Sequence, residues 1–236
     1  LAMKQLMPNA VVSEKPQWPK IFSGQYGTEI SALLLSKEKL VHSSLWGGDL
    51  EAFIFQGSAR GLFRKNQLLF SVADTSVYRL GKKAPAGSIL GARGPYGIFA
   101  AKVDTPLNNW FRKVYKDRYS VPPVGGSYQA AQGVLAAKYA YDKAAADNGG
   151  KFPTTLQVIA ALEGATFQGI AAKVYMNRSN GHQAATKHMI GVLEWDSEAG
   201  EPIMTKVIEF GPDCVMPPPG VNATEWLKGG MKGAKC

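Results

Sequence analysis

Short apolar runs alternate with helix-like stretches over the first ninety residues. The runs expected to form strands are Ala10–Ser13, Leu40–Trp46 and Leu68–Val72. Between them, the spacing of apolar residues predicts a helix at Thr28–Leu35 and a second helix for which Asp49 is the N-cap. Strands separated by helices of about a dozen residues form parallel sheets with right-handed crossovers. The pattern therefore predicts an α/β fold.

Later in the chain the pattern changes from helices to strands. The helices expected here begin at Asn108, run from Ser127 to about Asp147, and run from Thr154 or Thr155 to Gly164. The strands expected after them are Phe167–Met176, Lys187–Trp195 and Pro202–Phe210. Extended crossings at 87–97 and 166–175 are typical of a two-lobed protein with hinge connections. A single doubly wound domain remains the alternative, because periodicity does not separate the two.

Composition agrees with a folded chain that has an apolar core. Of the 236 residues, 45% are hydrophobic and 19% are charged. No apolar run approaches the roughly 18 residues of a membrane-spanning helix, so the chain is not expected to be membrane-embedded. The formal net charge is +9.

The positive charge is concentrated between residues 60 and 93. This stretch holds a single acidic residue, Asp74, and these basic ones: Arg60, Arg64, Lys65, Arg79, Lys82, Lys83 and Arg93. A nucleic-acid-binding face is one interpretation, and a solvated surface of helix ends and turns is the other. The second is preferred, because nothing here matches a zinc finger, an RNP-type strand or a basic helix with heptads. No nucleic-acid partner is expected.

No catalytic or cofactor-binding signature is present in the sequence. The three histidines have neither an HExxH pattern nor metal-ligand spacing, and no GxSxG elbow occurs. Dinucleotide and phosphate-loop motifs are also absent, and Gly91–Gly94 is too short to hold a pyrophosphate. A protein that is not an enzyme, with no metal and no cofactor, is therefore expected.

Aromatic and polar residues at the ends of predicted strands are better candidates for ligand binding. Ligands of parallel sheets bind at the carboxyl ends of the strands. The candidate ligand-binding residues are Ser44, Leu45, Trp46, Ala73, Asp74, Tyr96, Gly126 and Tyr128. A core position remains open for Trp46 and Tyr128, and a helix-capping role remains open for Asp74.

Two cysteines, Cys214 and Cys236, lie in a tail rich in proline and glycine. A disulfide between them would be worth roughly 3 kcal/mol by the chain-entropy model and is the preferred interpretation. Two free structural thiols remain the alternative.

Four stretches resemble type I periplasmic substrate-binding proteins of ABC transporters, in the branched-chain amino acid group. The stretches are Val41–Asp49 followed by a helix ending at Leu62, Asn109–Tyr119, Tyr128–Ala144, and Ala161–Phe167. The likeness extends over most of residues 1–210. One departure is Ala171–Ala172, where the family commonly has glycine on the crossing strand.

The resemblance implies two α/β lobes joined by three crossings, with the ligand between them. On this layout, residues 1–92 and 167–236 belong to the C-terminal lobe, and 93–166 form the closing part of the N-terminal lobe. The amphipathic start at Leu1–Met7 reads as the middle of a helix, so the N-terminal part of the fold is expected to be missing.

The same resemblance suggests roles for two residues. Trp46 corresponds to the aromatic residue that covers the ligand from the C-terminal lobe. Asp74, or its neighbour Ala73, falls where members that bind amino acids carry the acid that pairs with the ligand ammonium. If the position is Ala73, then a urea, an amide or an aromatic acid is favoured over an α-amino acid.

The leading hypothesis is an extracytoplasmic solute-binding protein that passes a small metabolite to an ABC transporter permease. The ligand classes considered are a small amino acid, an amide or urea, and an aromatic acid. The protein is expected to be periplasmic, with lipid anchoring open, and monomeric. A cytoplasmic ligand-sensing regulator of the same fold is the first alternative, and a basic nucleic-acid-binding protein is the second.

Overall fold

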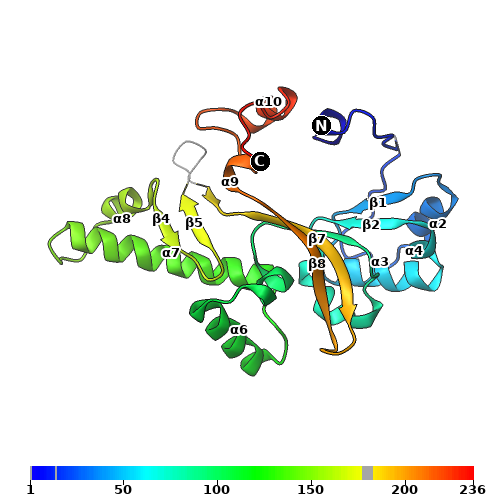
Figure 1. Cartoon of the computed structure of the whole chain (residues 1–236), viewed down its shortest axis with the longest axis horizontal. Coiled ribbons are helices and arrows are strands. Elements are labelled where there is room, and N and C mark those ends of the chain that lie inside the picture. Colours follow the sequence, from blue (N-terminus) through cyan, green and yellow to red (C-terminus); the bar gives the residue numbers. More distant parts are fainter. Residues whose placement is uncertain (1, 14, 177–182) are drawn as a thin grey trace.

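The chain forms a mixed five-stranded sheet with helices packed against it (Figure 1). The computed structural model describes residues 2–13, 15–176 and 183–236. The strands of this sheet, in spatial order, are β1 (Leu40–Ser43), β2 (Gln67–Phe70), β3 (Ile89–Ala92), β7 (His188–Asp196) and β8 (Glu201–Phe210). The first three run parallel, and β7 and β8 form an antiparallel hairpin added to the β3 edge. The α/β class predicted from the sequence is thus confirmed.

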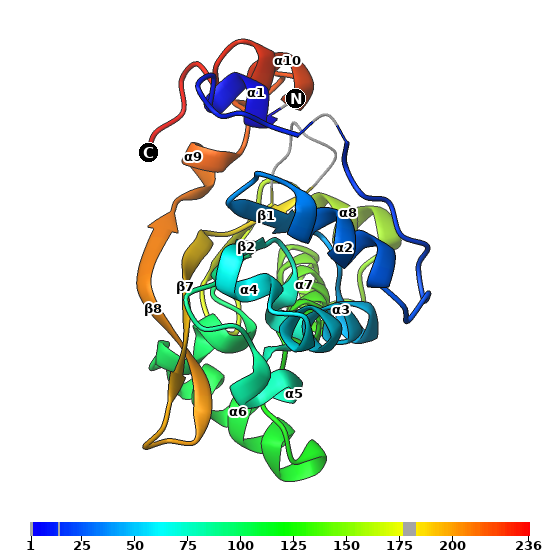
Figure 2. The ribbon, with the colours of Figure 1, turned by 90° about the vertical axis from the view of Figure 1, so that its right-hand side faces the viewer.

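Short helices cover this sheet and complete its core. They are α2 (Gly27–Leu35), α3 (Gly47–Ala59), α4 (Leu62–Lys65) and α5 (Val77–Leu80), with 3-10 turns η1 (Ala73–Thr75) and η2 (Gly81–Lys83). Figure 2 shows α2, α3 and α4 lying together beside β1 and β2. Leu50 and Ile54 of α3 pack with Leu68 of β2 and Leu90 of β3 in one apolar cluster. Burial of these side chains stabilises the sheet and its helices together.

A second group of elements lies beside the five-stranded sheet. It contains η3 (Gly97–Lys102), α6 (Pro106–Tyr119), α7 (Gly125–Asp147), α8 (Thr155–Leu162) and a small antiparallel sheet of β4 (Thr166–Gln168), β5 (Lys173–Met176) and β6 (Ala184–Ala185). Tyr96, Tyr128 and Ile170 belong to its own buried cluster. Tyr139 of α7 stacks on Phe167 of β4, with ring centroids 5.5 Å apart, which holds the small sheet against the long helix.

The two ends of the chain lie together, away from the sheets. Helix α1 (Ala2–Leu6) contacts α10 (Ala223–Lys228), and both figures show them side by side. The tail also contains α9 (Pro212–Val215), in which Cys214 is bonded to Cys236. The disulfide favoured by the sequence is confirmed. No helix in the described ranges is long and apolar enough to cross a membrane.

Two expected strands differ from the structure. Residues Ala10–Ser13 form no strand. Within the described ranges no strand pairs with them, and Val11 is 97% exposed. The run Phe167–Met176 is not one crossing strand but the hairpin of β4 and β5. The amide of Gly169 donates to the carbonyl of Ala172 (3.0 Å) in the turn between them, where a Cβ on Gly169 would come within 2.8 Å of that same oxygen.

Two expected helix caps are also different. Helix α3 begins at Gly47 rather than after Asp49, whose Oδ2 instead accepts the amide of Phe22 at 2.8 Å. Helix α7 begins at Gly125, two residues before Ser127, and its first amide is bonded to a side chain distant in sequence. That side chain belongs to the site described next. Both starts depend on tertiary contacts that local capping rules do not include.

Candidate functional site

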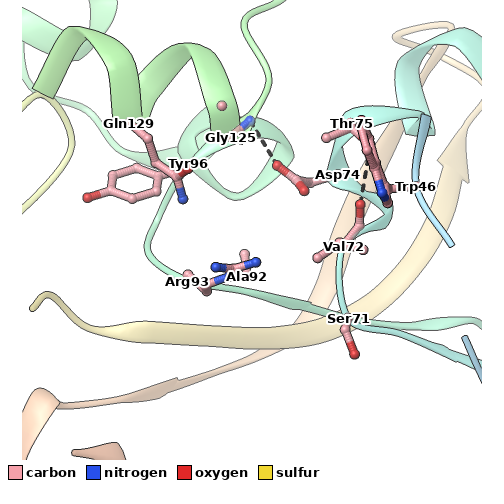
Figure 3. A pocket seen from close by; sticks show the side chains of 11 residues that line it. Trp46, Ser71, Val72, Asp74, Thr75, Ala92, Arg93, Tyr96, Gly125 and Gln129 are labelled. Carbon is pink, nitrogen blue, oxygen red and sulfur yellow. Dashed lines mark hydrogen bonds between the residues drawn. The ribbon is translucent and has the colours of Figure 1, made fainter. Parts of the chain in front are cut away.

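A cavity of about 260 Å³ opens at the carboxyl ends of the three parallel strands (Figure 3). Its lining residues follow β1, β2 and β3 in turn, and the N-terminus of α7 closes the opposite side. They are Trp46, Ser71, Val72, Asp74, Thr75, Ala92, Arg93, Tyr96, Gly125, Gly126 and Gln129. This is the edge at which α/β sheets bind their ligands.

The Asp74 carboxylate connects the strand edge to α7. Its Oδ2 accepts the backbone N–H of Gly125 at 2.8 Å, as the dashed line in Figure 3 shows. The fit is close, because a Cβ on Gly125 would lie 2.2 Å from Oδ2 and one on Gly97 3.1 Å from it. Asp74 therefore caps α7 from 51 residues away in sequence. A carboxylate at this position also complements the positive end of the helix dipole.

Burial raises the pKa of the Asp74 carboxyl above its ordinary value, opposed by the Gly125 N–H and the charge of Arg93. A carboxyl whose pKa is higher in the folded state than in the unfolded state, where it is about 3.9, stabilises the protein at low pH. This stabilisation is complete below the unfolded pKa and is lost as the pH rises through the folded pKa.

We therefore expect wild-type stability relative to Asp74→Asn to fall as pH increases from about 4 and then to level off. Urea unfolding midpoints measured across this range provide the test, with the exposed Asp117→Asn variant of α6 as control. A difference between wild type and Asp74→Asn that is the same at every pH would contradict the expectation.

The aromatic residues of the site differ in how much surface they present. Trp46, immediately before α3, is 58% exposed and offers a free ring surface to the cavity. Tyr96 is 4% exposed and stacks on Tyr128, with ring centroids 5.6 Å apart. The Tyr128 hydroxyl donates to Oδ1 of Asn108 at 2.8 Å. Trp46 therefore has exposed ring surface at the cavity, whereas Tyr96 is packed into the cavity wall.

Four of the predicted ligand residues line the cavity and four do not. Trp46, Asp74, Tyr96 and Gly126 line it. Of the others, Ser44 is exposed, Leu45 packs against the main core, Ala73 lies inside that core and Tyr128 inside the second. Ligand contact by any of the eight remains a prediction. The buried position of Tyr128 agrees with the core role that the sequence left open for it, and Ala73 is buried in the main core as well.

The most informative lining residue that was not among the predicted ones is Arg93. It directly follows β3, just as Trp46 and Asp74 lie after β1 and β2. The same strand-end rule finds it once β3 is known to end at Ala92. Gly91 and Gly94 interrupt the apolar pattern by which the sequence would otherwise indicate where β3 ends. Gln129 of α7 gives no comparable local signal.

Several members of the basic stretch 60–93 have partners within the protein. Arg60 donates to the carbonyl of Gly27 at 2.8 Å, Lys65 to that of Leu34 at 2.6 Å, and Arg79 pairs with Glu51. The ammonium groups of Lys82 and Lys83 lie over aromatic rings. These basic side chains therefore make contacts within the protein, mostly near the ends of helices. Within the described residues, no group of three His, Cys, Asp or Glu could hold a metal ion.

A profile of the periplasmic binding protein family matches residues 16–200. The chain belongs to the periplasmic binding protein family, and its fold is that of the type I members. A search of curated proteins found no match.

Solved structures with the same fold are distant in sequence. A solute-binding protein of an ABC transporter from Rhodopseudomonas palustris BisB5, in complex with 3,4-dihydroxybenzoic acid, has 17% identity and a TM-score of 0.64, with 80% of this chain and 49% of that one covered. A leucine-binding protein from Thermotoga maritima MSB8 has 15% identity and a TM-score of 0.62, with coverages of 84% and 52%. The chain thus spans about half the length of these proteins.

Proposed function

We propose that this protein is part of an extracytoplasmic solute-binding component of an ABC transporter. The single observation that carries the proposal is the cavity at the carboxyl edge of the parallel strands, with Trp46 open to it. Aromatic surface and a few polar groups converging on a cavity are the usual composition of a small-molecule site. The ligand classes are a small amino acid, an amide or urea, and an aromatic acid.

The family and the disulfide support the other parts of this proposal. Family members deliver ligands to a membrane permease, and we infer a permease as the partner and the periplasm as the location. Disulfides persist in oxidising compartments, so the Cys214–Cys236 bond favours this location over a cytoplasmic regulator. We retain residues 1–92 and 167–236 as one lobe, 93–166 as part of the other, and a monomer as the working state.

A thermal-shift screen of the intact protein tests the function. The library contains α-amino acids, their amides, urea and aromatic acids, each at millimolar concentration. A ligand that binds only the folded state raises the melting temperature, and the shift grows with the logarithm of its concentration once this exceeds Kd. Failure of every compound to raise it would contradict the proposal.

Trp46→Ala is expected to weaken binding of the best compound from this screen by about tenfold, because an aromatic contact is lost from the cavity. The melting temperature without ligand should hardly change, since the side chain is 58% exposed. Calorimetric titration gives the affinities. Trp110→Ala on α6 is the matched control, because Trp110 is 59% exposed and does not line the cavity. Equal weakening by both variants would remove Trp46 from the site.

A further inference from the structure

Among the described residues, two charged side chains line the cavity, and their partners differ. Asp74 is bonded to Gly125, whereas the Arg93 side chain has no hydrogen bond or ion pair with any residue in the described parts of the chain. An acid and a base that both face a cavity usually suggest a zwitterionic ligand. The contacts around each charge argue for a different division of roles.

The Asp74 carboxylate already has a hydrogen-bond partner within the protein. Its Oδ2 accepts the first amide of α7, and a side chain at Gly97 or Gly125 would crowd this carboxylate. The residue is partly buried, so a ligand ammonium would share the carboxylate with the Gly125 amide, in a site where burial already disfavours the charged form. Asp74 is therefore better suited to position α7 than to bind a ligand.

Arg93 is available to a ligand. It is exposed, follows directly on β3, and its guanidinium group lies below Asp74 in Figure 3. Its charge also contributes to lowering the pKa of His188 in β7, after the larger effect of burial, so its field extends to the neighbouring strand. A guanidinium has five N–H donors and binds a carboxylate through two of them.

We propose that Arg93 binds the anionic group of the ligand, while Asp74 positions α7 and does not bind a ligand ammonium. This assignment rests on the proposed function. The ligand is then an organic carboxylate whose apolar part lies beside Trp46. An uncharged amide or urea brings no negative charge to the guanidinium. Among the described lining residues, the only acid that an α-ammonium group meets is Asp74, which already accepts the Gly125 amide.

The test compares the binding of matched probes. Calorimetric titration of the wild type uses benzoate against benzamide, and 4-methylpentanoate against L-leucine, which differ in charge or in the α-ammonium group. The carboxylates without an ammonium group are expected to bind about 10- to 100-fold more tightly than their counterparts. Their affinity should also fall with added salt, because the contact is ionic.

Variants of Arg93 identify the residue responsible. Arg93→Gln is expected to remove the carboxylate preference and its salt dependence, and Arg93→Lys to restore part of both. Arg64→Gln is the matched control, since it removes the same charge from an exposed arginine outside this cavity. Undiminished carboxylate preference in Arg93→Gln, or tighter binding of L-leucine than of 4-methylpentanoate, overturns the assignment but not the function. Binding of none of the four probes to the wild type, in a protein for which the wider screen also finds no ligand, overturns both.

Discussion

Leu90→Ala is expected to lower the free energy of unfolding by about 2–5 kcal/mol. Leu90 is fully buried in β3, which is a central strand. Leu90 pairs with Phe70 of β2 on one side and with Gly191 of β7 on the other, so both neighbouring strands are fixed by backbone pairing. Removing three carbons there loses apolar burial and leaves a cavity that the sheet cannot close by moving. Urea unfolding should show a lower midpoint with an unchanged slope.

Leu35→Ala is the control for this substitution. Leu35 is 87% exposed at the end of α2, so the same loss of volume should change stability by no more than about 0.5 kcal/mol. Similar losses in the two variants would mean that β3 is not at the centre of the core.

Gly125→Ala is expected to lower stability by about 1.5–3 kcal/mol and to weaken ligand binding. The new methyl group would lie 2.2 Å from Oδ2 of Asp74, so the carboxylate has to turn away from the Gly125 amide. The variant therefore loses a charge-assisted hydrogen bond and leaves a partly buried acid without its partner. The start of α7, which forms one wall of the cavity, also loses its fixed position.

Gly126→Ala provides the control, since it is the next residue of the same helix. A Cβ there meets no atom within 4 Å, so alanine should leave stability unchanged or raise it by up to about 1 kcal/mol through its better helix propensity. Chemical unfolding of both variants gives the comparison. The interpretation fails if Gly126→Ala is destabilised as much as Gly125→Ala.

Much of the architecture follows from local sequence patterns. The strand predicted at Leu68–Val72 corresponds to β2 (Gln67–Phe70), and it is found because Leu68, Leu69 and Phe70 form a short apolar run. Helix α8 is found because Leu156, Ile159 and Leu162 are apolar at helical spacing and Gly164 follows as a stop signal. Both signals lie within a few residues of the element that they define, so sequence alone is sufficient for them.

The errors occur where distant segments decide the outcome. Ala10–Ser13 has strand composition, but no strand in the described part of the chain pairs with it, and composition does not provide a partner. The start of α7 depends on Asp74, which no capping rule connects with Gly125 across 51 residues. The turn at Gly169 depends on the close approach of this residue to the carbonyl oxygen of Ala172, which leaves no space for a Cβ.

The candidate site shows the same division. Local sequence placed Trp46 and Asp74 at strand ends, because the parallel α/β order brings such ends to one edge. Sequence by itself thus determined the fold class, the edge of the sheet at which the cavity opens and four of its lining residues, which are Trp46, Asp74, Tyr96 and Gly126. Only the tertiary structure decided that Tyr128 is buried, that Arg93 joins the cavity and that Asp74 is already bonded to α7. The physical reason is that burial and hydrogen-bond partners belong to pairs of segments, whereas a sequence pattern describes one segment at a time.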